Sequence, residues 1–158
     1  MATLYIKITQ GRFYAKNLDT NAVFDEPSVV VFQESASGSK TVIAVGKNAA
    51  DMALEEGFKR ISPFEIHPRV LVGDFETAQV IFKHAVRSIA GRSFVGPRII
   101  VHIDMDAAGG VSQVESRAFM ELAEAAGARD VKLLTRVTVA ESGMGQTELE
   151  ESLKKSFG

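Results

Sequence analysis

The chain has 158 residues, of which 46% are hydrophobic and 24% charged, with a formal net charge of −2 and no cysteine. This composition is typical of one globular domain over residues 1–158 and excludes a largely disordered chain. The absence of cysteine excludes disulfides, thiolate metal sites and a thiol nucleophile, and the lack of excess positive charge disfavours a nucleic-acid partner. No apolar run is long enough for a transmembrane segment, and the N-terminus does not resemble a signal peptide, so we expect a soluble, cytoplasmic protein.

Residues 3–9 and 12–18 alternate apolar and polar side chains, which is the period of a half-buried strand, whereas residues 28–32 are rich in β-branched residues. Residues 3–9 and 12–18 predict a hairpin around Gln10-Gly11, and residues 28–33 and 41–45 predict two more strands. Because connections this short join antiparallel neighbours, we expect the four strands to form one meander.

From residue 48 the pattern changes to that of helices. Asn48 is positioned to cap a helix through Glu56, and residues 148–155 predict a short charged helix. The two clearest helices lie between them, at residues 74–90 and 112–126. Each begins at a capping side chain, places apolar residues along one face at helical spacing, and stops at a glycine.

Three further segments predict strands, at residues 70–72, 98–103 and 131–134. The run at 98–103, Arg-Ile-Ile-Val-His-Ile, is nearly continuous in apolar residues and is typical of a strand covered on both faces. The helix at 112–126 connects it to the strand at 131–134, which predicts a parallel pair joined by a helical crossover. The chain is therefore predicted to be one α/β domain with a mixed sheet.

Three blocks of this sequence, at residues 25–32, 72–75 and 114–134, resemble the MreB family of rod-shape-determining, actin-like ATPases. The resemblance extends more weakly from about Leu4 to Gly143. It implies a ribonuclease-H-like lobe, the first lobe of the actin-like ATPase fold, with helices packed on a mixed sheet. The family builds filaments on the inner face of the membrane, so the resemblance also implies a role in cell shape or the cytoskeleton.

The opening hairpin departs from the family pattern. In the family its turn carries Asp-x-Gly-Thr, whose backbone amides hold phosphate and whose carboxylate orders the metal. Alignment of residues 25–30 with the matching family segment places Lys7 at the Asp position and Thr9 at the Gly position. A lysine attracts phosphate but cannot bind Mg²⁺, and threonine does not easily adopt the backbone angles open to glycine. We therefore expect a structural hairpin.

A second candidate site is the pair Asp104 and Asp106, at the end of the predicted strand 98–103. Carboxylates two residues apart on a strand point the same way and could share a divalent ion, at the strand end where open α/β sheets bind ligands. The alternative is a polar loop whose acidic residues favour the positive end of the next helix. Because two carboxylates fall short of the roughly six oxygens that a hard cation needs, we expect no metal.

A third candidate lies around Gly109-Gly110, which precedes a helix N-terminus and could favour an anion. These glycines match neither a P-loop nor a dinucleotide fingerprint, and Ser112 with Glu115 forms a capping box, so we expect a hinge or cap. The sequence has no Gly-x-Ser-x-Gly motif, so Ser112, Ser116 and His102 are not expected to form a hydrolase site. We expect His102 to be packed and hydrogen-bonded within its strand.

After the corresponding strand, the family carries an acidic residue that faces the nucleotide and the attacking water, whereas residues 135–139, beginning at Thr135, contain none. The second lobe of the family, with its second phosphate loop and adenosine site, has no counterpart beyond Gly143. We therefore predict no catalytic, cofactor-binding or metal-binding residue, no cofactor and no enzymatic activity. Two functions remain open: a non-catalytic lobe that binds protein partners, or a nucleotide or small-molecule binder whose site is completed across a homodimer.

The resemblance also bears on self-association. In a two-lobed relative, one face of this lobe packs around the nucleotide and against the second lobe. Residues 105–111 and 135–139 lie near that face and include apolar side chains. Since large apolar patches are rarely exposed on monomers, either residues 146–157 or a second copy must cover them. We expect a homodimer with twofold symmetry.

Overall fold

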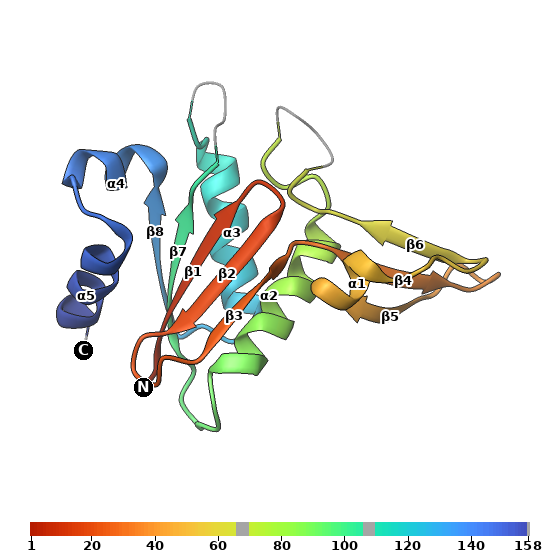
Figure 1. Ribbon diagram of the computed structural model, residues 1–158, viewed down its shortest axis with the longest axis horizontal. Helices are drawn as coiled ribbons and strands as arrows, with labels where there is room; N and C mark the ends of the chain where they lie inside the picture. The colour runs from red at the N-terminus through yellow and green to blue at the C-terminus, as the bar shows by residue number, and fades with distance from the viewer. Residues whose placement is uncertain (66–69, 106–109, 158) are drawn as a thin grey trace.

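The computed structural model describes residues 1–65, 70–105 and 110–157. Its larger sheet, called the main sheet here, has the strand order β3-β2-β1-β7-β8 (Figure 1). In that order the strands span Val23–Pro27, Arg12–Asn17, Thr3–Thr9, Arg98–Ile103 and Asp130–Thr135. β1 pairs antiparallel with β2 and parallel with β7, and β7 pairs parallel with β8. The predicted mixed sheet, with residues 98–103 in its interior, is confirmed.

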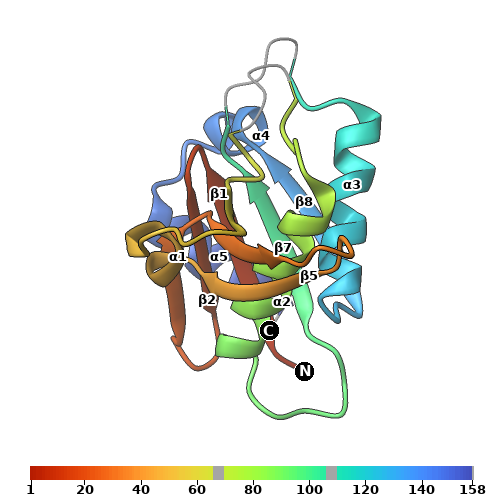
Figure 2. The same cartoon turned by 90° about the vertical axis from the view of Figure 1, so that its right-hand side faces the viewer.

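Helices α2 (Phe75–Ile89) and α3 (Gln113–Ala125) cover one face of the main sheet (Figure 2). The Asp74 side chain caps α2 by accepting a hydrogen bond from a backbone amide at 3.0 Å, and Ser112 with Glu115 forms the predicted capping box of α3. Both predicted helices are confirmed. Their buried faces meet the strands in a core whose aromatic rings pack edge-to-face or stacked, namely Phe13, Phe24, Phe64, Phe82 and Phe119.

The opposite face of the main sheet is covered by α5 (Gln146–Phe157), which extends the helix predicted at 148–155. Its Leu149 and Leu153 pack in a second buried cluster, together with Tyr5, Leu18, Ile100 and Leu134 of the main-sheet strands and loops. Residues 146–157 therefore cover part of the sheet face that would otherwise be apolar and exposed.

A short helix, α4 (Arg136–Ser142), joins β8 to α5 and is not predicted by the sequence pattern (Figure 1). Thr135 caps its N-terminus, and Gly143 ends it in the left-handed conformation, with φ 67°. The β-branched residues Thr138 and Val139 favour strands over helices, so residue propensities alone do not predict this helix.

The remaining strands form a small sheet that projects from the main sheet (Figure 1). It has the order β5-β4-β6 and consists of β4 (Val30–Glu34), β5 (Lys40–Val45) and β6 (Phe58–Ile61). Helix α1 (Lys47–Asp51) packs against it through Ala49, which meets Val31 and Ala44 in a third buried cluster.

The single meander predicted for the first 45 residues is wrong, because its strands divide between the two sheets. The sequence pattern did not predict β3, which pairs antiparallel with β2. Pro27 ends β3, since proline has no amide hydrogen to continue a ladder, and the Ser28 amide turns to donate to the Gly11 carbonyl at 3.1 Å. The strand predicted at 28–33 therefore begins only at Val30, in the small sheet.

Two further predictions are corrected. The helix predicted at 48–56 ends at Asp51, because Met52 is already extended and the following residues are needed to form β6 beside β4. Arg60 of β6 donates to two carbonyl groups at the end of α1, which fixes this turn. The strand predicted at 70–72 is reduced to an isolated bridge.

Candidate functional site

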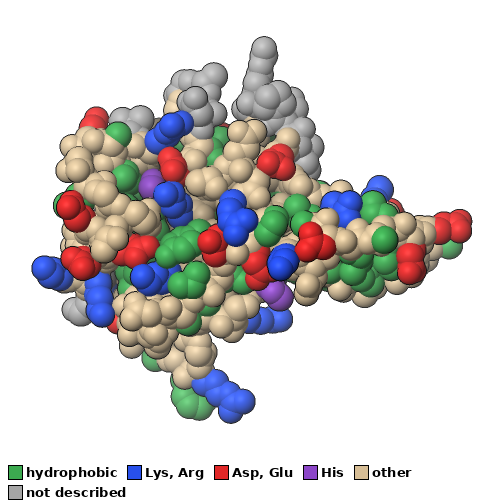
Figure 3. All heavy atoms as spheres, viewed as in Figure 1, with side chains coloured by type: hydrophobic (Ala, Val, Ile, Leu, Met, Phe, Trp, Pro, Cys, Tyr) green, Lys and Arg blue, Asp and Glu red, His purple; other side chains and the backbone are tan. Residues whose placement is uncertain are grey.

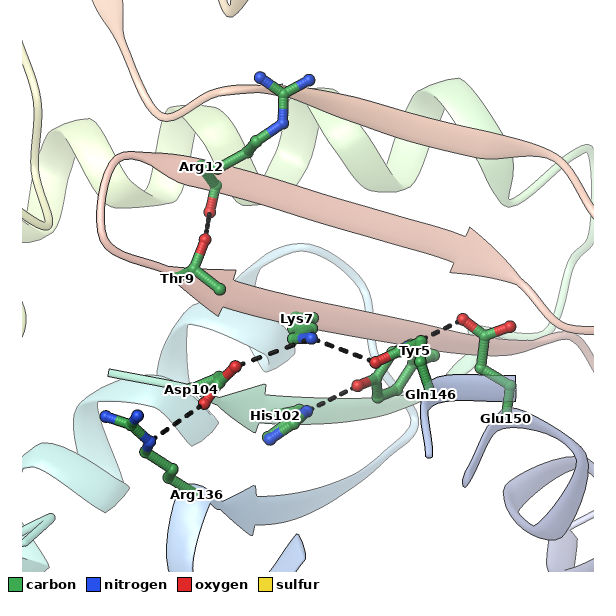
Figure 4. Close-up of polar contacts among 9 residues, drawn as sticks. All are labelled: Tyr5, Lys7, Thr9, Arg12, His102, Asp104, Arg136, Gln146 and Glu150. Atoms are coloured by element: carbon green, nitrogen blue, oxygen red, sulfur yellow. Dashed lines mark hydrogen bonds and ion pairs between the residues drawn. The ribbon is translucent and has the colours of Figure 1, made fainter. Parts of the chain in front are cut away.

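Parallel pairing of β1 with β7 gathers polar side chains on the sheet face that α5 covers. Lys7 lies opposite His102 in the register of the two strands, and Asp104 follows β7 directly. The segment after β8 adds Arg136 from α4 and Gln146 from α5 (Figure 4). We call these five residues the polar cluster.

Asp104 lies between two cations. Its Oδ2 is 3.7 Å from Nζ of Lys7, and its Oδ1 is 3.7 Å from Nε of Arg136. Lys7 also donates to Oε1 of Gln146 at 3.1 Å. With two basic groups and one acidic group, the polar cluster has a net charge of +1. No group of acidic and histidine side chains among the described residues could hold a metal ion, and Asp106 lies outside them.

A cavity of about 310 Å³ opens beside the polar cluster, between the main sheet and the α4–α5 segment. Its polar wall is formed by the polar cluster itself. Its apolar wall is formed by Val139, Ala140, Met144 and Leu149.

His102 is buried and bonded to Tyr5, whose hydroxyl oxygen is 2.6 Å from Nδ1 of the imidazole. Burial raises the pKa of Tyr5 and lowers the pKa of His102, so both groups are neutral at pH 7. We assign the tautomer in which Tyr5 donates to Nδ1 and the ring proton sits on Nε2. The prediction of a packed, hydrogen-bonded His102 is confirmed for Nδ1, whereas the buried Nε2 has no hydrogen-bond partner in the described structure.

Glu150 connects α5 to β2 of the main sheet through hydrogen bonds. Its buried carboxylate accepts hydrogen bonds from the Tyr14 hydroxyl at 3.1 Å, from Nζ of Lys16 at 2.9 Å and from the Gln146 amide at 2.9 Å. Burial alone would raise the pKa of Glu150, but these three hydrogen bonds hold it below its ordinary value. Burial together with the charge of Glu150 raises the pKa of Tyr14 to about 12. Sequence reasoning missed this contact, because no local periodicity links residue 150 to β2.

The hairpin around Gln10-Gly11 forms as predicted, with Gly11 at φ 80°. The Thr9 hydroxyl is 3.5 Å from the Arg12 carbonyl, and Arg12 Nε donates to Asp25 on β3 at 2.7 Å. The Thr9 hydroxyl and the Arg12 side chain are therefore bonded to other groups of the hairpin and of β3.

The other candidates from the sequence have structural partners. Ser112 accepts from the Glu115 amide at 3.1 Å as the predicted cap, and Gly109 lies outside the described residues. None of the hydrogen bonds of the described residues joins His102 to a serine. Thr135 accepts from the Thr138 amide at 3.3 Å, so a capping hydroxyl stands where the resemblance places an acidic residue.

Comparison with known families accounts for this architecture. The sequence model described as MreB/Mbl protein matches residues 9–152, which is most of the chain. The chain belongs to the MreB/Mbl family. The resemblance drawn from residues 25–32, 72–75 and 114–134 is confirmed.

Curated relatives match over most of this chain but over only part of their own length. The cell shape-determining protein MreB of Escherichia coli strain K12 is 33% identical over 126 residues, which cover 78% of this chain and 35% of that protein. The protein of the same name in Pasteurella multocida strain Pm70 is 32% identical over 124 residues, or 77% of this chain and 34% of that protein. The chain thus spans about a third of the length of these relatives.

Solved structures show the same fold. MreB 5 of Spiroplasma citri bound to AMPPNP superposes with a TM-score of 0.68 and 20% identity, over 85% of this chain and 38% of that chain. A non-polymerising mutant of MamK bound to AMPPNP gives a TM-score of 0.65 and 14% identity, over 85% of this chain and 40% of that chain. The predicted single actin-like lobe is confirmed at the level of fold.

We predict that His102 makes folding stability depend on pH. Burial lowers the pKa of His102 in the folded state, with Lys7 acting in the same direction and Asp104 opposing both. The unfolded chain therefore binds the proton more readily than the folded chain. The stability contributed by neutral His102 is fully present above the ordinary histidine pKa of about 6.5 and is lost as the pH falls below it. Urea unfolding at pH 7.5 and pH 5.5 measures this loss.

The matched control for this prediction is the exposed His84. We expect His102→Gln to reduce the difference in stability between the two pH values and His84→Gln to leave it unchanged. Equal pH dependence in both variants and the wild type would contradict the assignment.

Proposed function

We propose that this chain is a non-catalytic member of the MreB/Mbl family that acts through protein contacts, in the control of cell shape or of the cytoskeleton. The observation that carries the proposal is the Lys7–Asp104 ion pair, 3.7 Å long. Lys7 stands where the resemblance places a metal-ordering carboxylate, and an ammonium group cannot coordinate Mg²⁺. Phosphoryl transfer depends on metal and positioned charge, so losing the metal ligand removes its main source of stabilisation.

Two further residues support the absence of catalysis. Thr135 is engaged as a helix cap, where the resemblance implies an acid that orients water. Thr9 follows Lys7 on β1 and places a Cβ where the family has glycine. Each change alone weakens the nucleotide site, and together they affect the metal, the phosphate loop and the attacking water.

We expect the purified chain to release no phosphate from ATP in the presence of Mg²⁺ above the level of buffer alone. A colorimetric phosphate assay run beside a two-lobed MreB protein measures this. Turnover by the wild type that disappears in Lys7→Met would overturn the proposal, because it would place Lys7 in a working catalytic site.

A second candidate function is binding of a nucleotide or small molecule in a site completed across a homodimer. The cavity beside the polar cluster favours this candidate. Calorimetric titration with ATP and Mg²⁺ separates the two functions, because saturable binding in the micromolar range supports the second and its absence supports the first.

Self-association is part of the proposed function, though through a different surface from the one expected. Because α5 covers part of the face that suggested a homodimer, a second set of exposed apolar side chains is the better candidate, and it includes Val42 and Ile43 on β5. Edge strands usually carry charges that prevent pairing with another chain. The other edge strands each carry two charged residues: Asp25 and Glu26 on β3, Asp130 and Lys132 on β8, and Lys59 and Arg60 on β6.

On β5, only Lys40 at its start is charged, and a ladder irregularity leaves Ile43 unpaired with β4 and 37% exposed. We therefore expect a twofold dimer that covers this strand. Light scattering should give the mass of a dimer for the wild type and of a monomer for Ile43→Lys. A wild-type monomer at tens of micromolar would remove this part of the proposal.

We also propose that the chain contacts a membrane surface, because the resemblance implies filaments on the inner membrane face. None of the described helices is long and apolar enough to cross a membrane. The segment between α2 and β7, however, carries Phe94 and Val95 exposed beside the exposed Arg92. Figure 3 shows hydrophobic and basic side chains together at this tip.

We predict that Phe94 anchors the chain to anionic vesicles. Insertion of one phenylalanine side chain contributes about 1.5–3 kcal/mol, so Phe94→Ser should weaken vesicle binding about tenfold or more. Vesicle co-sedimentation measures this, and Val114→Ser, at an exposed apolar residue of α3, is the matched control. Equal binding by the two variants would contradict the prediction.

A further inference from the structure

We propose that the turn between α3 and β8 forms a second part of the membrane contact. In this turn Arg129 binds the phosphate of an anionic lipid headgroup, and Gly96 holds residues 91–97, called the Phe94 loop here, against the turn. The inference rests on the membrane contact proposed above for Phe94 and extends it to a segment distant in the sequence.

The Phe94 loop and the α3–β8 turn are joined by backbone groups. The Arg129 amide donates to the Pro97 carbonyl at 2.9 Å. Beside this hydrogen bond the two backbones are so close that a Cβ on Gly96 would overlap the Gly127 carbonyl oxygen and lie 3.3 Å from the Arg129 nitrogen. Gly127 itself has a φ of 107°, a conformation that favours glycine. A larger residue at position 96 would therefore push the loop away from the turn.

This contact fixes the end of the loop that carries the exposed apolar side chains. Phe94 is fully exposed and Val95 is 42% exposed, and Gly96 follows them directly. Figure 1 and Figure 2 both show the loop and the α3–β8 turn at the same end of the molecule. A loop that is already held loses less conformational freedom on insertion into a membrane, so more of the transfer free energy of Phe94 contributes to affinity.

The α3–β8 turn also brings a second cation to this end. Arg92 and Arg129 are both exposed, and neither takes part in an ion pair among the described residues. The next residue of the turn, Asp130, accepts a hydrogen bond from Nε of Arg98 at 3.1 Å. Guanidinium groups form charge-assisted, often bidentate hydrogen bonds with phosphate oxygens. Arg129 is therefore available to bind a phosphate.

A lipid surface fits both features of this end better than a soluble phosphate ester does. A soluble ester would meet the guanidinium groups but leave Phe94 in water. A membrane offers apolar chains directly below its charged headgroups, so Phe94 can insert while Arg92 and Arg129 stay at the level of the phosphates. The two arginines favour anionic lipids, because basic residues near a negatively charged leaflet are attracted to it.

The first test is co-sedimentation with vesicles of phosphatidylglycerol and phosphatidylcholine, and with vesicles of phosphatidylcholine alone. Arg129→Gln keeps the backbone amide that bonds to Pro97 and should weaken binding to the anionic vesicles about fivefold, as expected for one basic residue near an anionic surface. Arg117→Gln removes the same charge from an exposed arginine of α3 and should bind like the wild type.

The second test measures the loop without any membrane. Because the chain has no cysteine, Val95→Cys carries a single nitroxide label on the Phe94 loop. We expect slow label motion in this variant and faster motion when Gly96→Ala is added. Gly145→Ala is the matched control, since a Cβ at Gly145 meets no atom within 4 Å, and it should leave the label motion unchanged. Gly96→Ala should also weaken binding to anionic vesicles severalfold, although Phe94 and both arginines are retained.

Equal binding of anionic vesicles by Arg129→Gln and Arg117→Gln would overturn the assignment of Arg129. Equal label motion with and without Gly96→Ala would overturn the role of Gly96. Loss of binding in Phe94→Ser with wild-type binding in Arg129→Gln would contradict this inference alone, and the reverse would contradict only the Phe94 anchor. A wild-type chain that sediments with neither kind of vesicle would overturn both.

Discussion

The fixed register between β1 and β7 is the constraint on which the rest of the structure depends. Ile6 and Ile8 of β1, with Val101 of β7, are fully buried in the core that α2 and α3 cover. Because side chains alternate along a strand, a shift of one residue would turn this apolar set to the opposite face and bury Lys7 among phenylalanine rings. Core packing therefore determines which polar groups meet, and the position of Lys7 beside His102 follows from it.

The second face of the main sheet depends on a different kind of contact. Two leucines of α5 contribute apolar area there, but Glu150 determines how the helix lies, since its carboxylate is bonded to β2 and to the first turn of α5. A buried carboxylate that lost its donors would cost several kcal/mol, so alternative orientations of α5 are disfavoured. The α4–α5 segment is held close enough to the strands to complete the cavity.

The sequence predicted the elements whose signals are local. The helices at 74–90 and 112–126 have caps and apolar faces within one segment, and strand 98–103 has a continuous apolar run, so all three were found. α4 was not found, because its β-branched residues favour strands even though Thr135 caps it. β6 was not found, because it depends on pairing with β4, a strand distant in the chain. The single meander failed for the same reason, since the break after Pro27 depends on the choice between two sheets.

The residues of the candidate site also divide into those that the sequence singled out and those that only the tertiary structure brings in. The resemblance singled out Lys7 and Thr135, and the residues alone singled out His102 and Asp104, because each is a residue type that either departs from a motif or could act in one. Arg136, Gln146 and Glu150 were not predicted, because they meet Asp104, Lys7 and Lys16, respectively, only when α4 and α5 fold back over the sheet. Their roles are set by tertiary contacts between residues more than 30 positions apart.

One substitution links the fold to the chemistry. Position 7, where the resemblance places a metal-ordering carboxylate, carries a lysine that supplies a cation 3.7 Å from Asp104. In a metal site, acidic side chains near a strand end repel one another until the ion binds, whereas here the charge of Asp104 is balanced by side chains of the protein. The residue that carries the proposed loss of catalysis, Lys7, is therefore also one of the two cations that balance the charge of Asp104.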